Sequence, residues 1–176
     1  MKDKIFIAGG TCSGKSTLAI KIACHTGYSI TSFGDILRKY AIETGHCSTT
    51  IYLQSLGQEL IDKLGYDGFL KWTIEHSPYI QWNQPLVLDS LRHLTIYDYL
   101  NQMFPQNILI YCDCNKEIQL ARLMNRNGIS RENAHCILSH TLEKSVDMLK
   151  PVAHLLFRPE DSIEDFLLKL DILIKE

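Results

Sequence analysis

The sequence lacks an apolar run long enough to cross a membrane, and it lacks a surplus of charge of either sign. The chain has 176 residues with a formal net charge of −2, and 22 % of them are charged. A membrane span needs about 20 consecutive apolar residues, and a general nucleic-acid binder usually carries a basic surplus. The composition therefore predicts no membrane partner and argues against a nucleic-acid partner.

The six cysteines lack the spacing of a zinc site. No C-x-x-C pair is present, and Cys112 and Cys114 flank Asp113 with spacing that suits a zinc knuckle poorly. A secretory leader is not recognisable, because the first apolar run is short and leads directly into a glycine-rich loop. We therefore expect reduced thiols in a cytoplasmic protein. Repeats, low-complexity tracts and linkers are also missing, so we expect a single domain over residues 1–176.

A glycine-rich loop follows the apolar run Ile5–Ala8 and leads into a segment with helical spacing. The loop matches the phosphate-binding pattern G-x-x-x-x-G-K-[ST] in full. Its glycines let the backbone curl around phosphate oxygens, and the helix that follows presents unpaired N–H groups and the positive end of its dipole. The sequence thus predicts a nucleoside triphosphate site formed by Gly9, Gly10, Thr11, Cys12, Ser13, Gly14, Lys15, Ser16 and Thr17.

Three side chains near this loop are suited to the chemistry of a triphosphate. Lys15 supplies a mobile positive charge for the β- and γ-phosphates, and the Ser16 hydroxyl is placed to bind Mg²⁺. Asp89 ends the apolar run 86–88 and is a second candidate ligand for Mg²⁺. An acid at such a place can instead cap the next helix, so both roles of Asp89 stay open.

Apolar strands alternate with amphipathic helices along the chain. This alternation predicts a parallel sheet with helices on both faces, and ligands of such folds bind at the carboxyl ends of the strands. The predicted fold class is α/β: a three-layer α/β/α phosphate-loop NTPase fold with a five-stranded parallel sheet. We expect strands at 4–8, 28–31, 85–89, 107–112 and 152–157, and helices at 14–26, 32–45, 50–64, 67–76, 95–104, 116–125, within 129–149 and after Ser162.

The sequence lacks the motif by which GTPases recognise guanine, and this bears on the choice of nucleotide. GTPases use an N-K-x-D motif, whose acid holds the guanine edge with two oxygens. The stretch Asn115–Ile118 begins as this motif does but has isoleucine at the position of the acid, and the isoleucine side chain accepts no hydrogen bond. We therefore expect ATP rather than GTP.

Four segments together resemble the nucleoside-monophosphate-kinase-like branch of phosphate-loop kinases, which includes adenylate kinases and dephospho-coenzyme-A kinases. They are the loop itself, a G-D-[LM]-L-R-like segment, a D-G-x-x-R-like segment and two arginines like those before and within a lid. The chain departs from the family pattern where Ser90 replaces glycine, where Arg92 is one residue nearer the acid, and in the segment Leu53–Gly57. The segments that resemble the family are Gly9–Thr17, Phe33–Arg38, Val87–Arg92, Arg122 and Arg126.

The resemblance implies in-line transfer of the γ-phosphoryl group of Mg-ATP to a nucleotide-like small molecule, with a nucleoside monophosphate as the favoured acceptor. It also implies short helical segments that bind the acceptor, at about 32–80, and that act as a lid, at about 124–142. Arg38 and Arg92 would grip the acceptor phosphate, because a bidentate arginine matches that group. Arg122 and Arg126 lie four residues apart and would stabilise charge on the transferring group, unless they form a solvated helix face.

Asp35 leaves the type of acceptor open. It shares a helix face with Arg38, three residues on, so it can orient that arginine, form a surface ion pair with it, or act as a general base. A base would favour a hydroxyl acceptor such as dephospho-coenzyme A, a nucleoside or a nucleic-acid 5′ end. A third possibility, from a different class, is a regulatory protein that binds ATP and phosphorylates nothing.

Overall fold

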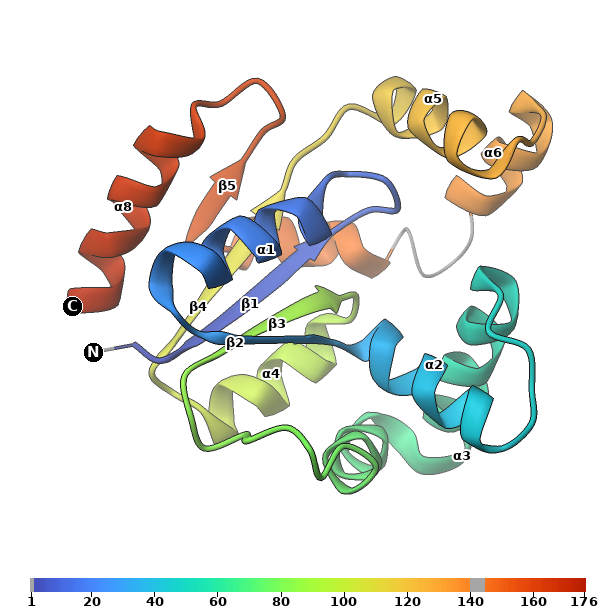
Figure 1. The fold of residues 1–176 in the computed structure, drawn as a ribbon, viewed down its shortest axis with the longest axis horizontal. Helices are drawn as coiled ribbons and strands as arrows, with labels where there is room; N and C mark the ends of the chain where they lie inside the picture. Colours follow the sequence, from blue (N-terminus) through green and yellow to red (C-terminus); the bar gives the residue numbers. More distant parts are fainter. Residues whose placement is uncertain (1, 140–144) are drawn as a thin grey trace.

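The computed structural model describes residues 2–139 and 145–176. Five parallel strands form its central sheet in the order β2-β3-β1-β4-β5, and helices cover both faces (Figure 1). The predicted three-layer α/β/α fold is therefore confirmed. The elements are β1 (Lys4–Gly9), α1 (Lys15–Thr26), β2 (Ser29–Ser32), α2 (Phe33–Glu43), α3 (Thr50–Glu75), β3 (Leu86–Leu91), α4 (Leu94–Met103), β4 (Asn107–Cys112), α5 (Lys116–Asn127), α6 (Arg131–Leu138), the 3₁₀ helix η1 (Asp147–Val152), β5 (Leu155–Phe157) and α8 (Ile163–Lys175).

Successive side chains of β1 point to opposite faces of the sheet, as in any strand. Ile5 and Ile7 pack with α1 and α8 on one face. Phe6 and Ala8 pack with α2, α3, α4 and η1 on the other. All four side chains are fully buried, and burial of a large apolar side chain contributes about 1.5–3 kcal/mol. Both layers thus hold β1 firmly, and with it the loop at its carboxyl end.

The helix α3 is broken at Gly65, where sequence periodicity predicts two helices. Gly65 has φ 71° and ψ 174°, a conformation that glycine adopts more readily than any other residue. The first half begins at Thr49, whose side chain accepts a hydrogen bond from the Tyr52 amide. The second half places Phe69 and Leu70 in the core. The break lets the two halves pack in different directions.

One difference from the expected elements has a local cause. The last strand begins at Leu155 rather than at residue 152, because residues 147–152 form η1 with Pro151 inside it. Proline has no N–H to donate to a strand ladder. The GTPase-like stretch has a structural role: the Asn115 side chain accepts from the Glu117 amide and begins α5.

The helices α5 and α6 form a hairpin in which Leu120 and Leu123 pack against Ala134. The hairpin lies past the carboxyl end of the sheet (Figure 1). Of the lid-like segment predicted at 124–142, residues 140–142 lie outside the described residues. Within the described ranges, no helix is both long and apolar enough to span a bilayer.

Candidate active site

Two cavities meet at the carboxyl end of the sheet. The donor cavity, of about 510 Å³, lies between the phosphate loop, α5 and the segment after β5. The acceptor cavity, of about 250 Å³, lies between the phosphate loop, α2, α3 and the segment after β3. Both are lined by Cys12, Lys15, Ser16 and Arg126. This arrangement allows two ligands to meet at the loop.

At the start of the phosphate loop there is no space for a side chain. A Cβ on Gly9 would lie 2.8 Å from Ser13 Oγ and 2.9 Å from Cys112 Cβ. Gly14 has φ 97° and begins α1 without a side-chain cap, so the first N–H groups of α1 are available to an anion. Burial raises the pKa of the Cys112 thiol to about 12, which keeps it protonated beneath the loop. The loop is thus shaped for phosphate oxygens.

Ser16 and Asp89 form the candidate Mg²⁺ site. Ser16 Oγ donates a hydrogen bond of 2.6 Å to Asp89 Oδ2, and Asp89 Oδ1 accepts from the Ser90 amide at 2.6 Å. Asp89 does not cap α4, whose N-cap residue is His93. A hydroxyl and a carboxylate oxygen suit Mg²⁺, which takes few protein ligands and completes its shell with waters and phosphates. These two residues therefore fit the ion.

Two non-glycine residues of the site have left-handed backbone conformations. Cys12 has φ 60° and Ser90 has φ 69°, and both line the acceptor cavity. Ser90 stands where the family pattern has glycine. Strained residues of this kind persist where the surrounding structure holds them, and here the Ser90 amide is held by Asp89.

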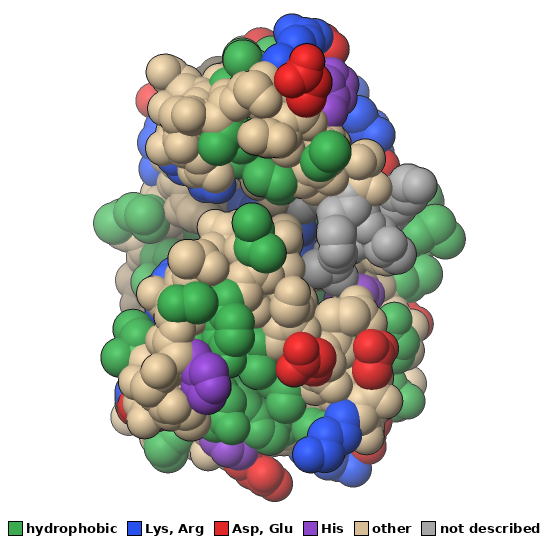
Figure 2. All heavy atoms as spheres, turned by 90° about the vertical axis from the view of Figure 1, so that its right-hand side faces the viewer, with side chains coloured by type: hydrophobic (Ala, Val, Ile, Leu, Met, Phe, Trp, Pro, Cys, Tyr) green, Lys and Arg blue, Asp and Glu red, His purple; other side chains and the backbone are tan. Residues whose placement is uncertain are grey.

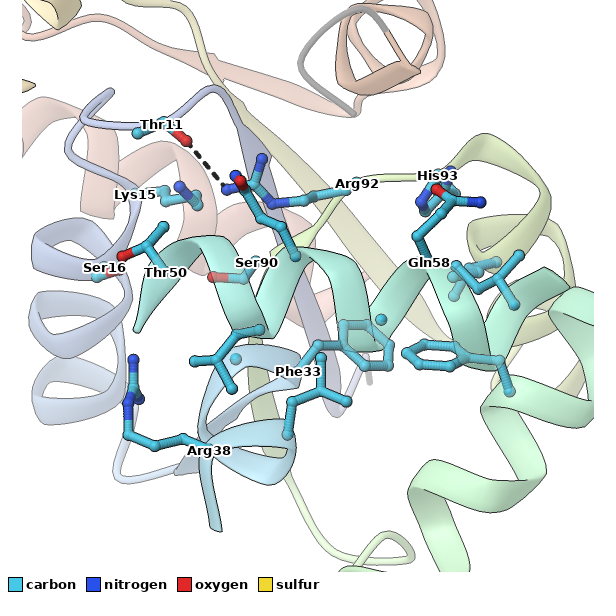
Figure 3. A pocket seen from close by; sticks show the side chains of 18 of the residues that line it. Thr11, Lys15, Ser16, Phe33, Arg38, Thr50, Gln58, Ser90, Arg92 and His93 are labelled. Atoms are coloured by element: carbon cyan, nitrogen blue, oxygen red, sulfur yellow. Dashed lines mark hydrogen bonds between the residues drawn. The ribbon is translucent and has the colours of Figure 1, made fainter. Parts of the chain in front are cut away.

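Cationic side chains surround the acceptor cavity. Lys15, Arg38, Arg92 and Arg126 line it, and Figure 2 shows Lys and Arg side chains in the hollow between the upper and lower parts of the molecule. Arg92 Nη2 donates to Thr11 Oγ1 at 3.2 Å (Figure 3), so it links the segment after β3 to the phosphate loop. The chain thereby places four positive charges where an anionic ligand would sit.

Backbone carbonyls of the phosphate loop accept hydrogen bonds from Arg122 and from Lys15. Arg122 Nη1 donates to the Cys12 carbonyl at 3.2 Å, and Lys15 Nζ donates to the Gly10 carbonyl at 3.1 Å. Arg122 and Arg126 both line the donor cavity. The two arginines that were predicted to stabilise the transferring group thus face the loop from α5.

Asp35 lies outside both cavities. Its amide donates to Ser32 Oγ at 2.9 Å, and its Oδ2 accepts from that same hydroxyl at 2.7 Å. Its Oδ1 accepts from Arg38 Nη1 at 2.6 Å. Ser32 thus caps α2, and Asp35, which is well exposed, binds both that cap residue and Arg38. Among the described residues that line the acceptor cavity, none is an aspartate or a glutamate.

The acceptor cavity also contains residues that the motifs do not include. Its apolar wall includes Phe33 and Phe69, and its polar residues include Gln54, Gln58 and His93. Burial, together with neighbouring Arg92, lowers the pKa of His93, so this ring is neutral near pH 7. Helical periodicity marks the apolar stripe of α3 but does not show which polar positions face a cavity.

Comparison with known proteins identifies the family. A family model described as an AAA domain matches residues 8–136, which include the phosphate loop and most of both cavities. The chain belongs to this family. The predicted resemblance to phosphate-loop kinases of the nucleoside-monophosphate-kinase-like branch is thereby confirmed.

A curated relative of this AAA-domain chain is a kinase. The chain is 30 % identical over 133 residues to UMP-CMP kinase 1 from Oryza sativa subsp. japonica, a match that covers 70 % of this chain and 50 % of the relative. The chain thus spans about half the length of the curated relative that it matches.

Solved structures share the fold at low identity. Shikimate kinase from Bacteroides thetaiotaomicron superposes with a TM-score of 0.59 at 17 % identity, with 100 % of both chains covered. A gluconokinase from Sinorhizobium meliloti superposes with a TM-score of 0.58 at 16 % identity, covering 99 % of this chain and 92 % of the other. At these identities the likeness concerns the fold alone.

Proposed function

We propose that this AAA-domain protein is a phosphotransferase that moves the γ-phosphoryl group of Mg-ATP to a nucleoside monophosphate. The observation that carries the proposal is the charge of the acceptor cavity. Four cationic side chains line it, and none of its described lining residues is a carboxylate. A phosphate acceptor arrives already ionised and needs positive charge, whereas a hydroxyl acceptor gains from a general base.

The triphosphate would occupy the loop Gly9–Thr17, next to the positive end of α1. Lys15 would contact the β- and γ-phosphates, and Ser16 with Asp89 would hold Mg²⁺, which supplies charge neutralisation when bound. Arg122 and Arg126 would stand on the α5 side of the transferring group. Positive charge fixed there stabilises the charge of an in-line transfer.

The acceptor phosphate would lie between Arg38 and Arg92. Arg92 is tied to the loop through Thr11, and Arg38 is oriented by Asp35. The role of Asp35 in this proposal is therefore to position an arginine. A proton acceptor is not required, since the attacking oxygen of a monophosphate is already charged.

The hydroxyl-acceptor alternative keeps one observation in its favour. The fold neighbours include shikimate kinase and gluconokinase, whose names indicate hydroxyl-bearing acids. Such an acceptor would need a base, and His93 lines the cavity with a ring nitrogen that can accept a proton.

The six free thiols support the cytoplasm as the proposed compartment, where a nucleotide acceptor is available.

The test is ATP consumption by the wild type across a panel of acceptors. The panel holds ribonucleoside and deoxynucleoside monophosphates, nucleosides, dephospho-coenzyme A, a 5′-OH oligonucleotide, shikimate and gluconate. We expect strong stimulation by a monophosphate, lost in Lys15→Ala and kept in Lys169→Ala, which changes an exposed lysine on α8.

Stimulation by a hydroxyl acceptor alone would overturn the proposed acceptor. Slow hydrolysis that no acceptor stimulates would instead favour the regulatory ATP-binding protein. Closure around a second substrate commonly completes a kinase site, so a true kinase should respond sharply to its acceptor.

A further inference from the structure

We propose that Asp113 is a positioning residue for the phosphoryl donor: it holds the segment after β5 in place as the wall that the nucleoside part of ATP contacts. The inference rests on the proposed function, because it takes ATP to be the ligand of the donor cavity. It gives a role to the stretch Cys112–Cys114, whose spacing suits a zinc site poorly.

Three neighbouring strands end together at the donor cavity. Gly9, the first residue of the phosphate loop, pairs with Cys112 across β1 and β4, and Cys112 pairs with Phe157 across β4 and β5. The end of β4 therefore lies between the phosphate loop and the segment after β5 (Figure 1). Asp113 is the first residue beyond β4, so it stands between two walls of the cavity.

The donor cavity extends beyond the phosphate loop. Its walls also include Phe157 and Pro159, on the segment after β5. If the triphosphate lies on the loop, the nucleoside part of ATP occupies the remaining space, where these two rings offer the apolar contact that is typical of ligand pockets. The placement of Phe157 and Pro159 therefore affects how tightly ATP binds through the part beyond its phosphates.

The carboxylate of Asp113 binds two cations. Its Oδ1 accepts from Lys150 Nζ on η1 at 2.7 Å, and its Oδ2 accepts from Arg158 Nε at 3.4 Å. Its amide donates to the Phe157 carbonyl at 2.8 Å. Lys150 and Arg158 lower the pKa of this carboxyl, so it is charged near pH 7. Asp113 thus connects both η1 and the segment after β5 to the end of β4.

Arg158 connects Asp113 to the wall of the cavity. It lies between Phe157 and Pro159 in the chain, and it is not among the described residues that line the donor cavity. Its amide donates to Asp161 Oδ2 at 2.7 Å, and its carbonyl accepts from the Asp161 amide at 3.0 Å. These bonds close a tight turn that begins at Arg158. Loss of the Asp113 carboxylate would therefore release the two lining residues through Arg158.

Positioning and simple electrostatics predict opposite effects of neutralising Asp113. Removal of its negative charge leaves Lys150 and Arg158 uncompensated, and this alone would strengthen the binding of any polyphosphate. Loss of the connection to Arg158 weakens only the contacts of the nucleoside part. ATP and inorganic tripolyphosphate separate the two effects, because tripolyphosphate can occupy the phosphate loop and has no nucleoside to contact the wall.

The experiment measures dissociation constants of Mg-ATP and Mg-tripolyphosphate by calorimetric titration near neutral pH, without an acceptor. The readout is the ratio of the constant for ATP to the constant for tripolyphosphate, which a change in the folded fraction does not alter. We expect Asp113→Asn to raise this ratio about fivefold, the scale of one partly exposed charged contact.

A matched control removes a carboxylate from an ion pair elsewhere. Asp67 pairs with Lys71 at 2.6 Å on α3, and neither residue lines the donor cavity in the described part of the chain. Asp67→Asn should leave the ratio as in the wild type. If Asp113→Asn also leaves it unchanged, whether both ligands bind more tightly, more weakly or as before, the positioning role of Asp113 is overturned.

A double variant shows whether Asp113 acts through Arg158. Arg158→Gln should raise the ratio to a similar degree. Asp113→Asn combined with Arg158→Gln should raise it no further than either change alone, since both break one connection. Additive increases would show that the two residues contribute separately, and positioning through Arg158 would be overturned.

The failure of this inference is distinguishable from the failure of the proposed function. If the wild type transfers phosphoryl groups from ATP but Asp113→Asn does not change the ratio, the positioning role fails and the kinase proposal stands. If the ratio responds but no acceptor is phosphorylated, the kinase proposal fails and the positioning role stands. A wild type that does not bind ATP would overturn both.

Discussion

Replacement of Ser90 by glycine should stabilise the protein. Ser90 has φ 69°, and a non-glycine residue in this region costs about 1–2 kcal/mol relative to the right-handed conformation. Glycine removes this cost but loses more chain entropy on folding, by about 0.5–1 kcal/mol. The net gain is then about 0–1.5 kcal/mol, with a central value of about 0.8 kcal/mol. Each kcal/mol raises the melting temperature of a chain of this size by roughly 2–4 °C. Urea unfolding and thermal melting at pH 7 measure it.

Two variants separate the backbone effect from the loss of the hydroxyl. Ser90→Ala keeps a Cβ at the same φ and should not gain stability. Ser55→Gly, on an exposed position of α3, should lose about 1 kcal/mol, the usual cost of glycine within a helix. If Ser90→Gly were destabilised as Ser55→Gly is, the left-handed conformation would not be a source of strain, and the reasoning would be refuted.

Three other predictions concern the charged groups. Lys15→Ala should lower kcat by about 10²–10³-fold, the scale of removing one fixed electrostatic group from a transition state, and single-turnover rates with saturating ATP would show it. Arg38→Ala should mainly raise the KM for the acceptor; an unchanged KM would place Arg38 outside the site. Lys150 and Arg158 lower the pKa of the Asp113 carboxyl in the folded protein. The charged carboxylate therefore stabilises the fold fully above the pKa that Asp113 has in the unfolded chain. This stabilisation is lost as the pH falls through the lower pKa of Asp113 in the folded protein. Asp113→Asn should therefore show a flatter fall of the urea midpoint between neutral and acid pH than the wild type, and parallel curves would count against this.

Local signals explain why much of the fold could be predicted. The strand, loop and helix over residues 4–27 follow from an apolar run, a glycine pattern and a C-terminal glycine, and Gly27 does end α1 in a left-handed conformation. Ser162 caps α8 by accepting from the Asp165 amide, as the sequence predicts. Each of these features is decided within a few residues, so no tertiary information is needed.

The parts that could not be predicted depend on distant residues. The Ser16–Asp89 hydrogen bond joins residues 73 apart in sequence, and the rule that strand ends converge indicates only that they are neighbours. The place of Gln54 at the acceptor cavity could not be predicted either. The helical period of α3 separates core residues from exposed residues, but it does not show which polar residues line a cavity. The 3₁₀ helix before β5 was also missed, since Val152 and Ala153 have the composition of a strand and only Pro151 signals a break.

The break at Gly65 separates two parts of α3 that have different surroundings. Before it, α3 gives the acceptor cavity most of its helical wall, from Thr50 to Ile61. After it, the helix is anchored in the core through Phe69 and Leu70. Substitutions in residues 50–64 change the wall that an acceptor meets, while the strand that carries the phosphate loop stays in place. Under the proposed function, substitutions confined to residues 50–64 would alter the choice of acceptor, and the loop that binds the phosphate donor would keep its position.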